Sequence, residues 1–252
     1  MSDDQHQTPR TKVIFVHGFL DDRTAWNDVL SFLGEDFEAV ALDLPGSGAH
    51  VNDEGPFTLR RLAESVIAEI DRSDEPVVLV GQSMGAPVSE LAAAARPGKV
   101  AGLVLLTPVP LAGVHLTGDA ANSFRSLGGD AEAQRQGRLG VSVSLTPQAL
   151  DVLLASGTAM HPTSVAQVFD AWNDGDNAGT TSSAYAGPTL IVHGNGDPFV
   201  TEEVIGAGVL PRFTKARLVG IANAGHFPHL EKPADVSRII SDFARSLDRV
   251  EA

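Results

Sequence analysis

Ser83 stands between two glycines in the segment Gly81-Gln82-Ser83-Met84-Gly85, a setting that suits a nucleophilic serine. An apolar, β-branched run at residues 76–80 precedes it, and an Ala-rich stretch at helical spacing, residues 86–95, follows it. The serine therefore belongs to a tight turn between a strand and a helix, where flanking glycines tolerate a strained backbone. We expect its hydroxyl at the carboxyl end of a parallel sheet, near a helix N-terminus that stabilises negative charge.

A five-residue pattern alone also fits a serine that only caps its helix. A serine hydroxyl becomes a nucleophile when a base, commonly a histidine oriented by a carboxylate, removes its proton. His226 lies between the last expected strand and the last expected helix, so its imidazole can reach Ser83. His229 is the competing base, and its place near the helix beside Glu231 favours a structural role at the surface.

The carboxylate that would orient the histidine follows the strand expected at residues 189–193. Asp197 comes after this strand and a glycine-containing turn, which places it at the same edge of the sheet as the serine. The other usual position, the segment 107–114, contains no Asp or Glu. Asp174 and Asp176 remain an alternative, although their surroundings are those of a solvated helix end.

The negative oxygen of an acyl-transfer intermediate needs backbone donors. The first expected strand ends at His17-Gly18-Phe19, so the N–H of Phe19 can meet the N–H of Met84, the residue after the serine. Losing one such donor costs about 3–4 kcal/mol of transition-state stabilisation. The alternative for Gly18 is an ordinary turn glycine.

Strand patterns alternate with helical patterns along most of the chain. The expected strands cover residues 12–16, 38–42, 77–80, 100–106, 189–193 and 216–220. The expected helices cover residues 24–33, 59–72, 87–96, 201–208 and 234–248. This order predicts an α/β fold with a mostly parallel, doubly wound sheet. We assign residues 11–108 and 188–252 to this core, and the polar residues 1–10 to a disordered leader.

Residues 109–187 contain no strand pattern and are too long for one crossover helix. Thr146-Pro147 and Pro162 begin two helical patterns, at residues 148–155 and 165–172. The segment leaves the sheet on the side of the serine, so we predict a helical cap, or lid, over it. The alternative is a subdomain that packs away from the site.

A cap would supply part of a substrate pocket. Val168 and Trp172 of the second helical pattern, with Leu20 and Trp26 after the first strand, are the residues predicted to line it. Packing of the cap onto the sheet would explain the apolar residues of the cap equally well, and only the first role changes the selectivity between substrates.

The amino-acid composition restricts the kinds of molecule that the protein is expected to bind. The 252 residues are 43% hydrophobic, enough for a buried core, and carry a net charge of −14 from 18 basic and 32 acidic residues. This balance excludes a phosphate-tracking surface for nucleic acid and disfavours anionic substrates. With no cysteine, disulfides, thiolate metal sites and a cysteine nucleophile are excluded. The sequence shows neither a secretory signal nor a membrane span, so we predict a cytoplasmic protein that acts on a small molecule. It carries no information on oligomeric state.

The motifs, taken together and in order, resemble the α/β-hydrolase fold superfamily, specifically its small bacterial esterase-like members with a helical cap. They are His17-Gly18-Phe19, Asp43-Leu44-Pro45-Gly46-Ser47-Gly48, Gly81-Gln82-Ser83-Met84-Gly85, His193-Gly194-Asn195-Gly196-Asp197, and Gly225-His226 followed by Glu231-Lys232-Pro233. The resemblance implies a triad of Ser83, Asp197 and His226, an oxyanion hole of Phe19 and Met84, and a structural Asp43. It implies no metal and no organic cofactor.

These observations predict a serine hydrolase that cleaves a carboxylic ester, or a related acyl bond, of a small and fairly apolar substrate through an acyl-enzyme. A serine at position 83 disfavours the epoxide and haloalkane chemistry of relatives with an aspartate nucleophile. The alternatives are lactone hydrolysis, carbon–carbon bond hydrolysis, a cofactor-free perhydrolase or haloperoxidase reaction, and a non-catalytic ligand-binding protein on the same scaffold.

Overall fold

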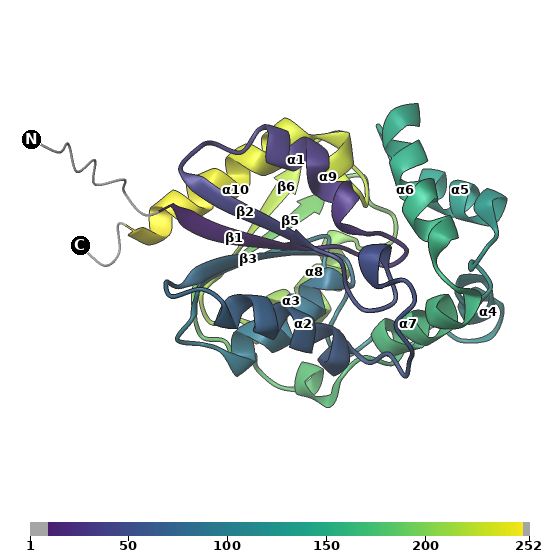
Figure 1. The fold of residues 1–252 in the computed structure, drawn as a ribbon, viewed down its shortest axis with the longest axis horizontal. Coiled ribbons are helices and arrows are strands. Elements are labelled where there is room, and N and C mark those ends of the chain that lie inside the picture. The colour runs from purple at the N-terminus through teal and green to yellow at the C-terminus, as the bar shows by residue number, and fades with distance from the viewer. Residues whose placement is uncertain (1–9, 249–252) are drawn as a thin grey trace, which may run out of the picture.

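Six parallel strands form the centre of the computed structural model, which describes residues 10–248 (Figure 1). The strands are β1 (Thr11–Val16), β2 (Phe37–Leu42), β3 (Val77–Gln82), β4 (Val100–Leu106), β5 (Thr189–Gly194) and β6 (Ala216–Ile221). Their order in the sheet is β2-β1-β3-β4-β5-β6, and every neighbouring pair is parallel. The predicted α/β class is confirmed, and each predicted strand is present with bounds that differ by two residues or fewer.

Helices cover both faces of this sheet. They are α1 (Asn27–Ser31), α2 (Leu59–Asp71), α3 (Gly85–Ala95), α8 (Glu202–Gly208), α9 (Pro228–Glu231) and α10 (Pro233–Asp248). Alternate residues of a strand point to opposite faces, so Ile14 of β1 belongs to the apolar cluster that includes residues of α2, α3 and α8, while Phe15 belongs to the cluster that includes residues of α1 and α10. The doubly wound arrangement follows from strands that are apolar on both sides.

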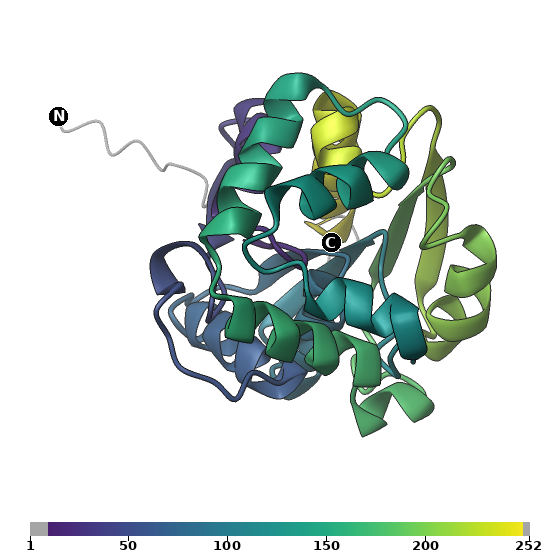
Figure 2. The same cartoon turned by 90° about the vertical axis from the view of Figure 1, so that its right-hand side faces the viewer.

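The segment between β4 and β5 contains four α-helices, a short 3-10 helix at Asn177–Thr180 and, as far as the structure describes the chain, no strand. The α-helices are α4 (Gly118–Arg125), α5 (Ala131–Gly140), α6 (Pro147–Ala159) and α7 (Pro162–Asp174). We call residues 109–187 the insertion. Its helices lie together at one end of the sheet (Figure 1), and Figure 2, viewed from that side, shows them in front of the strands. The division of the chain into a core and a cap as separate domains stays a prediction.

Helices α6 and α7 occupy the two segments that the sequence predicted as helical. Thr146 caps α6 by accepting a hydrogen bond from the N–H of Ala149, and Pro147 occupies its first turn. Helices α4 and α5 were not predicted, because α4 is rich in Gly, Asp, Asn and Ser and α5 has no apolar stripe.

Two further predictions bear on the ends of the chain and on membranes. The predicted leader, residues 1–10, lies outside the described residues except for Arg10. Among the helices of residues 10–248, none is both long enough and apolar enough to span a bilayer.

Candidate active site

Ser83 occupies the sharp turn between β3 and α3. Its φ angle of +50° lies in the left-handed region, which costs an ordinary residue about 1–2 kcal/mol. The N–H of Ser83 donates to the carbonyl oxygen of Leu106 on β4 at 2.9 Å, which holds the turn against the sheet. A Cβ at Gly85 would overlap the carbonyl oxygens of Val16 and His17, so only glycine fits at that position.

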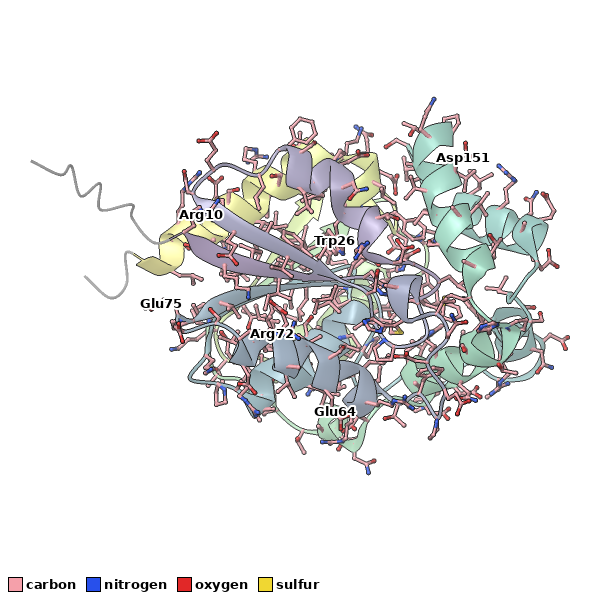
Figure 3. All side chains as sticks on the ribbon, in the orientation of Figure 1. Arg10, Trp26, Glu64, Arg72, Glu75 and Asp151 are labelled. Carbon is pink, nitrogen blue, oxygen red and sulfur yellow. The ribbon has the colours of Figure 1, made fainter. Side chains whose placement is uncertain are left out.

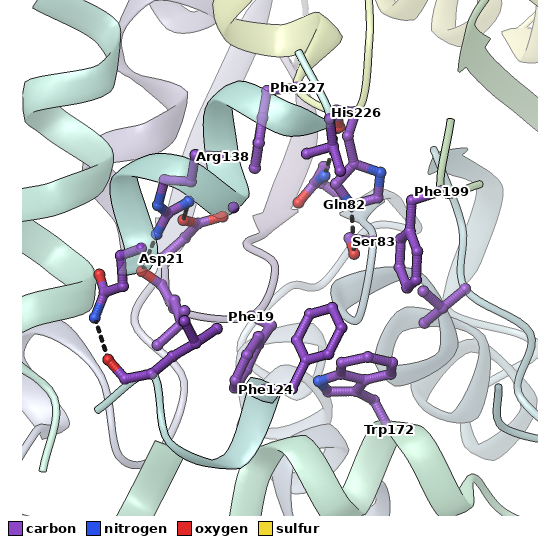
Figure 4. Close-up of a pocket in the computed structure, with 16 residues that line it drawn as sticks. Phe19, Asp21, Gln82, Ser83, Phe124, Arg138, Trp172, Phe199, His226 and Phe227 are labelled. Carbon is purple, nitrogen blue, oxygen red and sulfur yellow. Dashed lines mark hydrogen bonds and ion pairs between the residues drawn. The ribbon is translucent and has the colours of Figure 1, made fainter. Parts of the chain in front are cut away.

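The structure brings Ser83, His226 and Asp197 into one hydrogen-bonded chain. Figure 4 shows the part of it that joins Ser83 to His226. The Oγ of Ser83 lies 3.0 Å from Nε2 of His226, and Nδ1 of His226 lies 2.7 Å from Oδ2 of Asp197. All three side chains are buried. A carboxylate next to Nδ1 keeps the proton on that nitrogen, which leaves Nε2 free to accept the proton of the serine hydroxyl.

Asp197 is held as a carboxylate. Burial by itself raises the pKa of Asp197, but the hydrogen bond from His226, the charge of that imidazole and the backbone N–H groups of Phe199 and Val200 together bring the pKa below its usual value. These N–H groups donate to Oδ1 at 2.8 and 3.0 Å, so both carboxylate oxygens are occupied. The aspartate is therefore fixed in position and charge.

The loop that carries His226 is anchored to the sheet by two residues that the sequence analysis did not single out for this role. The carbonyl oxygen of His226 accepts hydrogen bonds from Nε2 of Gln82, at 3.0 Å, and from Oγ1 of Thr107, at 3.1 Å. Gln82 precedes the serine and Thr107 follows β4, so both lie at the carboxyl edge of the sheet. Their position at that edge was the feature by which the sequence could have identified them as part of the site.

The same loop is anchored to the insertion. The N–H of His226 donates to the carbonyl oxygen of Val141 at 2.8 Å. The buried carboxylate of Glu231 accepts from the N–H groups of Gly225 and Phe227 within the loop. It also accepts from two N–H groups of the insertion, those of Val143 at 2.9 Å and Ser144 at 2.7 Å.

The predicted oxyanion donors, Phe19 and Met84, flank the serine at the ends of β1 and β3. Among the hydrogen bonds within residues 10–248, none has the N–H of Phe19 or Met84 as its donor. The role of both groups as oxyanion donors stays a prediction. Leu20, the residue after Phe19, has a φ angle of +65°, so this turn is strained as well.

A pocket of about 660 Å³, including its open mouth, lies beside Ser83 and His226 (Figure 4). Its apolar walls come from both parts of the chain: Phe19, Leu20, Phe199 and Phe227 from the core, and Phe124, Leu127, Val141 and Trp172 from the insertion. Polar side chains of Asp21, Gln134 and Arg138 lie at one end.

Two of the four predicted pocket residues, Leu20 and Trp172, line this cavity. Trp26 does not, because its ring packs in the core layer between the sheet and α1 (Figure 3), 5.1 Å from the ring of Phe15. Val168 does not line this cavity either, because its face of α7 turns toward a separate, smaller cavity beside Met84. These two residues therefore lie away from the pocket beside Ser83, because the direction of a side chain depends on packing that its place in the sequence does not fix.

Aromatic side chains join the insertion to the core along the pocket. The ring of Trp172 meets that of Phe19 edge-on at 5.8 Å and that of Phe124 at 5.4 Å. Phe199 extends the cluster to His226, whose ring lies 5.6 Å away. Phe124 was missed because it belongs to the unpredicted α4, whereas Phe199 had a signal in its place two residues after Asp197.

His229 is not at the surface, contrary to the prediction. Its side chain is buried, and its ring lies 4.8 Å from that of Trp26. Burial, with the charges of His226 and Arg138, lowers the pKa of His229 to about 3. This histidine is therefore neutral near pH 7, and it has a structural role in the core.

The other polar residues of the sequence motifs, and a residue considered as an alternative to Asp197, make structural contacts. Nε2 of His17 accepts from the N–H of Leu44 at 3.1 Å. Asp43 accepts from the N–H groups of Arg23 and Ala49. Asp176, one of the alternatives to Asp197, pairs instead with Arg60 at 2.7 Å. Across residues 10–248, no group of three or more potential ligands is arranged to hold a metal ion.

The chain has a parallel six-stranded sheet, with a serine at the turn after β3, an aspartate after β5 and a histidine after β6. This arrangement defines a class of enzyme scaffold. The model of the Alpha/beta hydrolase family matches residues 13–239, and the chain belongs to this family.

Three proteins illustrate what the chain is similar to. The dihydrolipoyllysine-residue acetyltransferase component of the acetoin cleaving system of Cupriavidus necator is 28% identical over 242 residues, which cover 90% of this chain but only 62% of that protein. The pimeloyl-[acyl-carrier protein] methyl ester esterase of Neisseria meningitidis serogroup A is 28% identical over 254 residues, covering 94% of this chain and 77% of that one. A thermophilic esterase from Thermogutta terrifontis has the same fold, with a TM-score of 0.75, 23% identity, and coverage of 94% and 90% of the two chains.

Proposed function

We propose that this hydrolase cleaves carboxylic esters through a covalent acyl-enzyme on Ser83. The observation that carries the proposal is the hydrogen-bonded chain from Ser83 through His226 to the buried carboxylate of Asp197, set beside a pocket. A binding protein that only used the pocket would not need a serine aligned at 3.0 Å with an imidazole that is itself fixed by a carboxylate.

The reaction divides into two acyl transfers. In the first, Nε2 of His226 takes the proton of the Ser83 hydroxyl while Oγ attacks the ester carbonyl carbon, and the N–H groups of Phe19 and Met84 bind the resulting oxyanion. The intermediate collapses, the carbon–oxygen bond to the alcohol breaks, and His226 returns the proton to the departing alcohol oxygen. In the second, water gives one proton to His226 while its oxygen attacks the acyl carbon. The bond from that carbon to Oγ then breaks, His226 returns the proton to Oγ of Ser83, and the acid is released.

Asp197 serves both steps by keeping Nδ1 of His226 protonated and by stabilising the imidazolium that forms when Nε2 accepts a proton. The backbone donors at Phe199 and Val200 hold the carboxylate below the ring, so the ring keeps its orientation toward Ser83 throughout.

The pocket favours a small, fairly apolar acyl or alcohol group. Its walls are chiefly aromatic and aliphatic, and the net charge of −14 opposes the approach of anionic substrates. The insertion acts as a cap in this proposal, because it supplies the wall that contains Phe124 and Trp172 and so sets the width of the site. The methyl ester esterase and the thermophilic esterase named above support an ester as the substrate.

A fluorophosphonate probe tests the proposal. It should label the wild-type protein once, at Ser83, and abolish hydrolysis of a chromogenic short-chain ester. Ser83→Ala should be neither labelled nor active, while Ser126→Ala, at an exposed serine of the insertion, should behave as wild type. Labelling elsewhere with full ester turnover in Ser83→Ala would rule out the serine mechanism.

A further inference from the structure

The turn that carries the oxyanion donor Phe19 is held from outside the core. Leu20, next in the chain, is strained at a φ of +65°, and its carbonyl oxygen accepts two hydrogen bonds from the insertion. Nη2 of Arg138 on α5 donates at 2.8 Å. The single hydroxyl hydrogen of Ser156 on α6 is shared between this oxygen, at 3.2 Å, and the carbonyl oxygen of Leu153, at 3.0 Å. A strained peptide persists only where its surroundings over-determine it, and here those surroundings are the two insertion helices.

Arg138 also pairs with the next residue of that turn. Its Nη1 lies 2.8 Å from Oδ1 of Asp21, and the two side chains are only 5% and 1% exposed. A third bond, from Nη2 to the carbonyl oxygen of Leu153, ties the guanidinium to α6. Figure 4 shows Arg138 and Asp21 side by side, across the pocket from Ser83. A buried guanidinium that donates to several acceptors holds them in fixed relative positions, because its planar set of N–H groups allows one geometry only.

The residues directly after Arg138 hold the other half of the site. The carbonyl oxygen of Val141 accepts the N–H of His226, and the N–H groups of Val143 and Ser144 reach the carboxylate of Glu231 behind the histidine. A stretch of seven residues, 138–144, therefore contacts both the oxyanion turn and the histidine loop.

We propose that residues 138–144, which we call the clamp, assemble the catalytic machinery: the active geometry at Phe19 and His226 exists only while the insertion is seated on the core, and Arg138 is its principal positioning residue. This inference rests on the proposed function. If the insertion lifts off the core and takes the clamp with it, Leu20 loses the hydrogen bonds from Arg138 and Ser156 that hold its strained turn, and His226 loses the acceptor of its N–H. The substrate then gains access to a site that cannot yet react, and closure over it completes the site.

If Arg138 only attached the insertion to the core, its replacement would have a different effect. Weaker docking of the insertion would reduce stability and loosen substrate binding, which raises KM, but it would leave the chemistry of the bound state unchanged. A positioning role acts on the transition state, whose oxyanion needs the N–H of Phe19 in place, so it lowers kcat.

The test compares Arg138→Lys with Arg135→Lys, which makes the same change one turn earlier on α5 at a more exposed arginine. Lysine keeps the charge opposite Asp21 but cannot reach Asp21, Leu20 and Leu153 together. Two readouts are measured at a pH where the wild type is active: steady-state hydrolysis of a short-chain ester, and inhibition by an alkyl boronic acid, which bonds to Ser83 and places an oxygen among the oxyanion donors.

Arg138→Lys should lower kcat by about 10- to 100-fold, with KM within about threefold of wild type, because a misplaced oxyanion donor costs transition-state stabilisation. The affinity for the boronic acid should fall by the same factor as kcat/KM. Ser156→Ala, which removes one of the two bonds to Leu20, should move both readouts in the same direction by a smaller factor, and it decides the question if Arg138→Lys does not fold. Arg135→Lys should match wild type.

Wild-type kcat and boronic-acid affinity in the folded variants, or a rise in KM alone, would overturn the clamp. These results are separable from failure of the proposed function. Hydrolysis that depends on Ser83 but not on Arg138 refutes this inference only, whereas hydrolysis that survives in Ser83→Ala refutes the serine mechanism itself.

Discussion

Replacing Glu231 by glutamine should loosen the histidine loop and destabilise the fold. Oε1 of Glu231 accepts from the N–H groups of Gly225 and Phe227, and Oε2 accepts from those of Val143 and Ser144. An amide has one oxygen, so whichever way the glutamine is oriented, its NH₂ group faces two N–H donors that have lost their acceptor.

The size of the effect follows from those contacts. Hydrogen bonds to a charged group contribute about 1.5–3 kcal/mol each, so losing two at the lower value removes about 3 kcal/mol from the free energy of unfolding. For a chain of this size, 1 kcal/mol corresponds to roughly 2–4 °C in Tm, which gives a fall of roughly 6–12 °C. We also expect kcat to fall, because the loop carries His226.

Thermal unfolding followed by circular dichroism, together with ester hydrolysis well below Tm, measures both effects. Glu132→Gln is the matched control, since its carboxylate is 70% exposed and contacts Arg135 and Gln136 at the surface of its own helix. A Tm for Glu231→Gln that equals that of the control would refute the role assigned to this carboxylate.

Three other outcomes are expected. Asp197→Asn should lower kcat by about 10⁴-fold through the wrong histidine tautomer, and Asp176→Asn should have little effect; steady-state kinetics that reverse this order would move the acid elsewhere. His229 ionises at about 6.5 when unfolded but at about 3 in the fold, so its stabilising contribution is complete above pH 6.5 and is lost as the pH falls toward 3. Urea unfolding at pH 6.5 and 5 should show a loss of about 1.5 kcal/mol from this group, absent in His229→Phe. Trp172→Ala should change the ratio of kcat/KM between short and long acyl chains more than Trp26→Ala does; equal ratios in an ester panel would remove Trp172 from the pocket.

The strands and the three aligned residues of the site were predictable because local pattern determines them. A buried parallel strand needs a continuous apolar run, as at Val77 to Val80, and polar residues that follow such strands must meet at one edge of the sheet. Ser83, Asp197 and His226 each occupy such a place, so strand assignment was sufficient to bring them together.

The residues that hold the site in position could not be predicted in the same way. Arg138 is one of two arginines in a polar helix, and nothing in its surroundings in the sequence shows that it is buried against Asp21. Glu231 was noticed only as a neighbour of His229 and as part of a motif, since two of its four donors, the N–H groups of Val143 and Ser144, come from a distant segment. Trp26 and Val168 were assigned to the pocket because they are apolar and near it in sequence, but side-chain direction depends on packing that forms only in the fold.

Mass spectrometry of the protein during turnover tests the central claim most directly. When a slowly deacylating ester is mixed with enzyme and quenched in acid, the account predicts that the intact protein gains the mass of one acyl group, that peptide mapping places it on Ser83, and that it disappears at the rate of product release. His226→Ala should prevent its formation. Rapid hydrolysis with no covalent adduct at any time point, or an adduct on a residue other than Ser83, would contradict the account.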